Sequence, residues 1–172
     1  IPYTWKSSKI VFVNSMSDLF HKDIPLEFLQ RVFKVMNDNP QHVFQVLTKR
    51  ADILLKYHKE FEWTHNIWMG VSVEDAKSLG RINLLRRTKA KVKFLSCEPL
   101  LTDWGEINLE NINWVIVGGE SGPNARLIEE DWILNIYKQC RNAEIPFFFK
   151  QWGGVNKKKN GKELQGMIYQ EM

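Results

Sequence analysis

The chain has 172 residues, of which 44% are apolar and 26% charged, with ten glycines and six prolines. A domain of this size buries roughly 70% of its unfolded surface, and the composition excludes collagen-like, low-complexity and intrinsically disordered proteins. No apolar run reaches the roughly 18 residues of a membrane-spanning helix, and residues 1–6 lack the apolar stretch of a secretory signal. We therefore expect a soluble, cytoplasmic protein with no membrane partner.

The charges nearly balance. The chain has 24 Lys and Arg against 20 Asp and Glu, and the excess of four equals the lysines at positions 157, 158, 159 and 162. The remainder carries no net charge, so a nucleic acid has only weak support as a partner, and a solvated lysine-rich segment is the preferred interpretation. Cys97 and Cys140 form no C-x-x-C pair, which argues against a disulfide framework or a zinc ribbon. We expect Cys97 to be a small polar residue near the site and Cys140 to be core.

The first half of the chain alternates short apolar runs with segments of helical spacing. Strands are predicted at residues 10–13, 43–47 and 66–71, and helices at 25–36, 51–61 and 76–87. The first helix has an apolar stripe made of Phe28, Leu29, Val32, Phe33 and Met36. Asp75 is the predicted N-cap of the third helix.

The second half continues this pattern with one exception. Strands are predicted at residues 92–95, 114–117 and 146–149, but no long helix separates the first two. A helix at 129–143 is predicted to turn inward Trp132, Ile133, Ile136, Tyr137 and Cys140. Residues 153–172 are polar and contain glycine, and they predict an irregular tail or a small hairpin. We therefore assign residues 1–154 to one domain and 155–172 to a C-terminal tail.

Alternating strands and helices indicate an α/β fold with a parallel sheet, either doubly wound or closed as a barrel. A doubly wound sheet would be expected to place a glycine-rich phosphate turn after its first strand, but residues 14–18 read NSMSD and no G-x-G-x-x-G occurs. A barrel is favoured, although a complete one has eight strands. The expected fold is a partial, TIM-barrel-like (β/α) barrel of about six parallel strands.

Every predicted strand is followed by polar residues. The carboxyl ends of parallel strands lie at one rim of a barrel, which is where ligands bind. The candidate substrate- or cofactor-binding residues at this rim are therefore Asn14, Ser15, Ser17, Asp18, His21, Thr48, Lys49, Arg50, Ser72, Glu74, Ser96, Glu98, Gly118, Gly119, Glu120, Ser121, Lys150, Gln151 and Trp152. Trp152 is expected to contact a ligand ring, and no residue is assigned as catalytic.

Other interpretations of the rim stay open. A ring of structural ion pairs would join its acidic residues to an equal number of cations, namely Asp18, Glu74, Glu98 and Glu120 with Lys49, Arg50, Arg126 and Lys150. Residues 118–122, GGESG, suit either an anion-binding turn or a plain turn. Asp18 and His21 with Glu74 or Glu98 have the chemistry of a divalent metal site, but no H-x-H or H-E-x-x-H spacing supports one. The remaining histidines, His42, His58 and His65, are expected to be structural or solvated.

Six segments together resemble a phage- and prophage-associated family of radical-SAM-like proteins of unassigned function. They are FVNSMSDLFH (12–21), LTKR (47–50), GVSVE (70–74), FLSCEPLL (94–101), VIVGGESG (115–122) and FFFKQWG (147–153). The resemblance implies a partial barrel that binds S-adenosylmethionine and a [4Fe–4S] cluster held by an upstream three-cysteine motif. This chain lacks that motif, and two separated cysteines cannot supply three ligands.

Three functional hypotheses follow. The first is the substrate-facing barrel domain of a radical-SAM-like protein that acts on a small-molecule or nucleotide-like substrate and is inactive without the cluster-binding part. The second is a non-catalytic barrel that binds a phosphorylated ligand or partner. The third is a metal-dependent hydrolase that uses the rim carboxylates. An incomplete barrel also exposes a sheet edge at its first strand, through which copies of the chain are expected to associate.

Overall fold

A computed structural model describes residues 2–14 and 16–172 of the chain. The strands are β1 (Ile10–Val13), β2 (Val43–Thr48), β3 (Ile67–Ser72), β4 (Val92–Cys97), β5 (Trp114–Gly118) and β6 (Phe147–Gln151). The α-helices are α1 (Leu26–Asn37), α2 (Ala51–Tyr57), α3 (Gly80–Arg86), α4 (Glu130–Asn142) and α5 (Lys157–Asn160). Short 3-10 turns are formed by Pro2–Thr4, His58–Glu60 and Ala76–Ser78.

The strands occupy one sheet in the order of the sequence, β1-β2-β3-β4-β5-β6. The pairs β1–β2, β2–β3, β4–β5 and β5–β6 are parallel. A doubly wound sheet changes its strand order at a switch point, whereas a (β/α) barrel keeps sequence order. The predicted α/β fold, a partial (β/α) barrel of six parallel strands, is therefore confirmed. Within the described part of the chain, no helix has both the length and the apolar character needed to cross a membrane.

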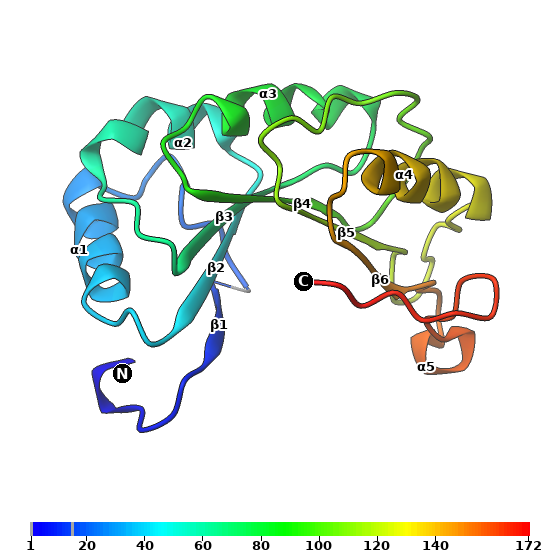
Figure 1. Cartoon of the computed structure of the whole chain (residues 1–172), viewed down its shortest axis with the longest axis horizontal. Helices are drawn as coiled ribbons and strands as arrows, with labels where there is room; N and C mark the ends of the chain where they lie inside the picture. The colour runs from blue at the N-terminus through cyan, green and yellow to red at the C-terminus, as the bar shows by residue number, and fades with distance from the viewer. Residues whose placement is uncertain (1, 15) are drawn as a thin grey trace. The chain divides into compact units, whose positions relative to one another are not determined.

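The chain divides into two compact units. The first comprises the residues up to Val71 together with Arg81–Lys93, and the second comprises Ser72–Gly80 and Phe94–Met172. Figure 1 labels the elements of both units.

In the first unit, α1 packs with the buried side chains of Leu29, Phe33 and Met36. Phe33 stacks on Phe61 with ring centroids 4.1 Å apart, so aromatic packing dominates this core. The predicted stripe is wrong at Phe28, which is exposed. The face of the sheet that carries Ile10 and Phe12 is also open, since these side chains are 57% and 45% exposed.

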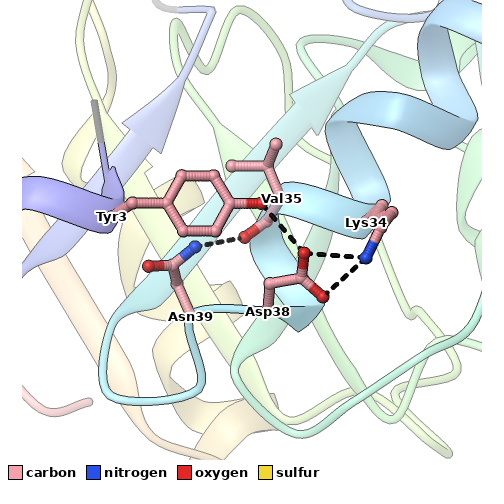
Figure 2. Close-up of polar contacts among 5 residues, drawn as sticks. All are labelled: Tyr3, Lys34, Val35, Asp38 and Asn39. Carbon is pink, nitrogen blue, oxygen red and sulfur yellow. Dashed lines mark hydrogen bonds and ion pairs between the residues drawn. The ribbon is translucent and has the colours of Figure 1, made fainter.

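The segment before β1 is fixed to the end of α1. The hydroxyl of Tyr3 donates to Asp38 Oδ2 at 2.9 Å, and Lys34 Nζ donates to both oxygens of the same carboxylate (Figure 2). Asn39 Nδ2 donates to the backbone oxygen of Val35 at 2.7 Å and closes the last helical turn. These bonds give the amino-terminal turn a defined place on the first unit.

Two predicted helices differ from the observed elements. The predicted helix at 51–61 ends at Tyr57 and continues as a 3-10 turn, because the backbone oxygen of His58 accepts the indole N–H of Trp63 at 2.8 Å. The predicted helix at 76–87 is a 3-10 turn followed by α3. Asp75 forms the predicted cap, accepting a bond from Ser78 N at 3.0 Å.

In the second unit, α4 buries Ile133, Ile136 and Cys140, while Trp132 and Tyr137, also predicted to face inward, are partly exposed. The carboxyl-terminal residues add to the open edge of β6: Phe149 N donates to Tyr169 O at 2.9 Å. Leu164 is fully buried. Residues 155–172 thus contribute to the core and to the sheet of this unit.

Candidate functional site

In the first unit, the rim is organised by Asp18. Its Oδ1 accepts bonds from Phe20 N at 2.9 Å and Thr48 Oγ1 at 2.7 Å, and its Oδ2 accepts one from Lys49 N at 2.9 Å. The parallel register of β1 and β2 brings the loop after β1 to the end of β2, where these groups meet. The carboxylate of Asp18 therefore joins the loop after β1 to the end of β2 through hydrogen bonds.

The other predicted residues of the first unit lie in the loop after β1 or just after β2. Asn14 adopts a positive φ of 57°, a conformation that asparagine tolerates, and accepts a backbone bond from Ser17 N. His21 faces Asp23, with Nδ1 to Oδ2 3.4 Å. Arg50 N donates to Thr48 Oγ1 at the start of α2. The predicted residue Ser15 lies outside the described residues.

In the second unit, the ends of β3 and β4 are joined through their backbones. Val73 N donates to Ser96 O at 2.9 Å, and Leu101 N donates to Glu74 O at 2.8 Å. The predicted residues Ser72 and Ser96 are buried. These bonds direct the chain after β4 across the sheet and position the following residue pair, Glu98 and Pro99.

Glu98 is the centre of a polar network that joins the carboxyl ends of β4 and β6. Lys150 Nζ donates to Glu98 Oε2 at 2.8 Å, and Gln151 Nε2 donates to Glu98 Oε1 at 3.3 Å. Gln151 Nε2 also lies 2.9 Å from Ser121 Oγ, to which it donates, in the loop after β5. The network therefore links residues from the carboxyl ends of β4, β5 and β6.

A cavity of about 430 Å³ opens at this network. It is lined by Glu98, Pro99, Gly119, Glu120, Ser121, Lys150 and Gln151. All of these except Pro99 were predicted from the polar strand ends. Pro99 carries no polar side chain, and its place directly after Glu98 is the one signal that could have identified it.

The glycines of the loop after β5 allow it to approach the loop after β6. A Cβ on Gly119 would overlap the backbone oxygen of Trp152, and a Cβ on Gly153, whose φ is 78°, would overlap that of Glu120. Gly119 N donates to Gln151 O at 2.9 Å, and Gly122 N donates to Gly154 O at 3.2 Å. These two N–H groups bond to protein carbonyls and are therefore not available to an anion.

Glu120 is held by Arg126, a residue that the sequence suggested only as a counter-charge. Arg126 Nε and Nη2 each donate to one carboxylate oxygen at 2.8 Å, and Arg126 N donates to Oε2 at 2.9 Å. These bonds lower the pKa of Glu120 from 4.5 to about 2. The pair closes the loop beside the cavity and confines the carboxylate of Glu120.

Gly118 and Trp152 are the remaining predicted residues of the second unit. A Cβ added to Gly118, at the end of β5, would lie 3.5 Å from the side chain of Glu98. The indole of Trp152 donates to Glu163 O at 2.7 Å and packs edge-on against Phe149. The indole thus fixes the C-terminal segment, and its expected contact with a ligand ring stays a prediction.

The cysteines lie in the protein interior. Cys97 and Cys140 are both fully buried. Burial raises the pKa of Cys140 to about 12 and that of Cys97 well above its usual value. In residues 2–14 and 16–172, no group of three or more His, Cys, Asp and Glu side chains has the arrangement of a metal site.

A second cavity, of about 560 Å³, was not predicted. It lies between residues 106–112 of the loop after β4 and the carboxyl-terminal half of α4. Gln139 from α4 lines it and accepts a bond from Ile107 N at 2.8 Å. Residues 106–112 precede β5, and the other lining residues lie in α4 or just after it, so none of them shows the polar strand-end pattern on which the prediction was based.

Searches of curated proteins and of solved structures returned no match. A comparison with protein families matched residues 1–172, the whole chain, to a family described as "Protein of unknown function (DUF5131)". The strand-end network and its cavity therefore belong to a chain that is a member of the DUF5131 family.

Proposed function

We propose that the cavity at the carboxyl ends of β4, β5 and β6 binds a small ligand that carries an amino or amide group beside a hydrogen-bond acceptor. The carboxylate of Glu98 is the observation that carries the proposal. It lines the cavity, its side chain is 23% exposed, and it lies between Lys150 and Gln151. A ligand amine can take the place of Lys150 on the carboxylate, which frees the ammonium group for an acceptor on the same ligand.

The charge of the lining favours this ligand over a phosphate. Two carboxylates, Glu98 and Glu120, face the cavity with one ammonium group, that of Lys150. The N–H groups of Gly119 and Gly122 donate to protein carbonyls. Both cations near the cavity are already paired, Lys150 with Glu98 and Arg126 with Glu120, so a phosphate would have to displace a carboxylate and the phosphorylated ligand has less support.

The resemblance to phage-associated radical-SAM-like proteins adds a role to this site. In such a protein, the chain would supply the substrate-facing wall of the barrel and hold the substrate in water-excluding surroundings. Cys97 and Cys140 do not fit the cluster, because two buried cysteines that are distant in the sequence cannot supply its three thiolate ligands. Glu120, paired with Arg126, is likewise not disposed to bind the amino group of S-adenosylmethionine.

The proposal is tested by ligand binding to the 172-residue chain. Thermal shift and isothermal titration calorimetry with the common amino acids, adenosine, S-adenosylmethionine and inorganic phosphate identify the ligand class. We expect a compound bearing an amine or amide to bind, and Glu98→Gln to weaken it at least about tenfold, or about 1.4 kcal/mol. The control Glu62→Gln removes an exposed carboxylate of the first unit and leaves the affinity unchanged.

Two results would contradict the proposal. One is that none of these compounds binds. The other is that phosphate binds and Glu98→Gln strengthens its binding, which would identify an anion site and restore the phosphorylated-ligand hypothesis.

A further inference from the structure

The two units carry opposite net charge, although the charges of the whole chain nearly balance. The first unit has 15 Lys and Arg against seven Asp and Glu, and the second has nine against 13. Their formal net charges are therefore +8 and −4. The lysine-rich helix α5 belongs to the second unit, so it contributes nothing to the charge of the first.

Three cations of the first unit lie around one buried histidine. His58 is 8% exposed, and its Nδ1 accepts a hydrogen bond from the backbone N–H of Lys89 at 3.0 Å. This bond fixes the segment before β4 against the 3-10 turn that holds Lys59. Burial lowers the pKa of His58, and the charges of Lys59, Lys89 and Arg87 lower it further. The hydrogen bond from Lys89 N therefore brings the segment that carries Arg87 and Lys89 to the turn that carries Lys59.

The segment before β4 directs its cations outward. Thr88 and Ala90 are buried, whereas Arg87, Lys89 and Lys91 are exposed. The hydroxyl of Thr88 donates to a backbone oxygen near the end of α3 at 2.7 Å, which anchors the segment. The cations are thus presented on a backbone that is already ordered, which lowers the entropy lost when a partner binds.

The charges of the segment before β4 have little compensation within that segment, whereas Lys59 is followed by Glu60 and Glu62. Residues 81–93 contain six Lys and Arg and no acidic residue. In the part of the chain that the structure describes, no carboxylate forms an ion pair with the side chains of Lys59, Arg87 or Lys89. Like charges held on one surface repel one another, and a polyanion relieves that repulsion.

We propose that Lys59, Arg87 and Lys89 form a binding surface for the phosphodiester backbone of a nucleic acid. Several cations on an ordered surface can contact successive phosphates, and such contacts are made without regard to sequence. The surface lies in the connections that precede β3 and β4, at the amino ends of the strands. It is therefore formed by other residues than the ligand site proposed above.

A nucleic acid fits this surface better than an anionic membrane does. Binding at a membrane surface combines cations with apolar side chains that enter the lipid. The large apolar residues that the structure exposes in the first unit are Tyr3, Ile10, Phe12, Met16 and Phe28. None of them belongs to the segments that carry the three cations.

The test is fluorescence anisotropy of a labelled DNA duplex and a labelled single-stranded RNA, each about 20 nucleotides long, between about 50 and 200 mM salt. The variant Lys59→Gln/Arg87→Gln/Lys89→Gln is compared with Lys77→Gln/Lys138→Gln/Lys162→Gln, which removes three exposed lysines of the second unit. Both variants lose the same net charge, so a difference between them reports position rather than total charge.

We expect the cluster variant to bind at least about tenfold more weakly at low salt. It should also flatten the slope of log K against log salt by about 2 to 3, because each phosphate contact contributes about 0.9. The control variant stays within about twofold of the wild type. The charge-preserving variant Lys59→Arg/Lys89→Arg retains binding, and circular dichroism verifies that every variant is folded.

The proposal is overturned if the wild-type chain binds neither oligonucleotide at low salt, or if the cluster and control variants weaken binding equally. It is also overturned if phosphatidylserine vesicles bind through the cluster while the oligonucleotides do not. If the cluster variant fails to fold, the charge-preserving variant Lys59→Arg/Lys89→Arg serves instead. Loss of binding in that variant also overturns the proposal.

Discussion

Replacing Gly119 with alanine tests the close packing of the two loops that form the cavity. The added Cβ would overlap the backbone oxygen of Trp152 and lie 2.7 Å from its carbonyl carbon, whereas real Cβ contacts are essentially never shorter than 3.0 Å. The neighbouring atoms belong to backbone, so a change of rotamer cannot relieve the overlap. One of the loops must therefore move.

The expected cost follows from how firmly the loops are joined. Overpacking a core typically costs about 1–3 kcal/mol. Here Gly119 N donates to Gln151 O at 2.9 Å and Gly154 N donates to Glu120 O at 2.6 Å, so a shift breaks hydrogen bonds as well. We expect a loss near the upper limit, about 3 kcal/mol, which lowers the urea midpoint by about 1.5 M for an m-value of about 2 kcal/mol/M.

The measurement is urea unfolding followed by circular dichroism, with Gly80→Ala as the matched control. A Cβ at Gly80 meets nothing within 4 Å, and this residue begins α3. The control should keep its stability or gain up to about 1 kcal/mol, because alanine favours helix. A loss below about 0.5 kcal/mol in Gly119→Ala would refute the close approach of the loops.

Three further predictions concern other parts of the chain. The pKa of Glu120 is lowered from 4.5 to about 2 by Arg126, so its contribution to stability is complete above pH 4.5 and is lost as the pH falls toward 2. Glu120→Gln should flatten the fall of the urea midpoint in this window, and an equally steep fall in both proteins would argue against the pair. Cys97 and Cys140 should resist a thiol reagent at about pH 8 until urea is added, because burial raises both pKa values, and rapid labelling of the native chain would contradict that burial. Phe12→Lys, on the strand at the end of the sheet, should reduce concentration-dependent association in analytical ultracentrifugation, and an unchanged sedimentation profile would exclude this edge.

Local patterns in the sequence were sufficient for the order of elements. The apolar runs of β1 to β6 and the helical stripe of α4 lie close to their predicted positions, because burial of an apolar face is encoded by spacing along the chain. The cap at Asp75 was also predictable, since the capping oxygen and its donor are three residues apart. The limits of α2 were not, because its end depends on a bond to the side chain of Trp63.

The polar strand ends identified where a ligand site should lie but not which of its residues meet. Glu98 and Lys150 are 52 positions apart, and only the pairing of β4, β5 and β6 brings their side chains together. The same reasoning selected Asp18 but did not show that its carboxylate bonds to Thr48 and to the backbone N–H of Lys49, and its place in a ligand site stays a prediction. The residue types show which positions carry a charged side chain, whereas tertiary packing determines whether that side chain contacts solvent or protein.

The sequence by itself determined the α/β alternation, the polar rim and the overall charge of this protein. Only the tertiary structure decided that Glu98 borders a cavity, that Cys97 is buried, and that Lys89 lies beside His58. The physical reason is that elements form through neighbours a few residues apart, whereas a site forms from side chains distant in sequence. Their distances are set by strand register and helix packing, which one-dimensional patterns do not contain.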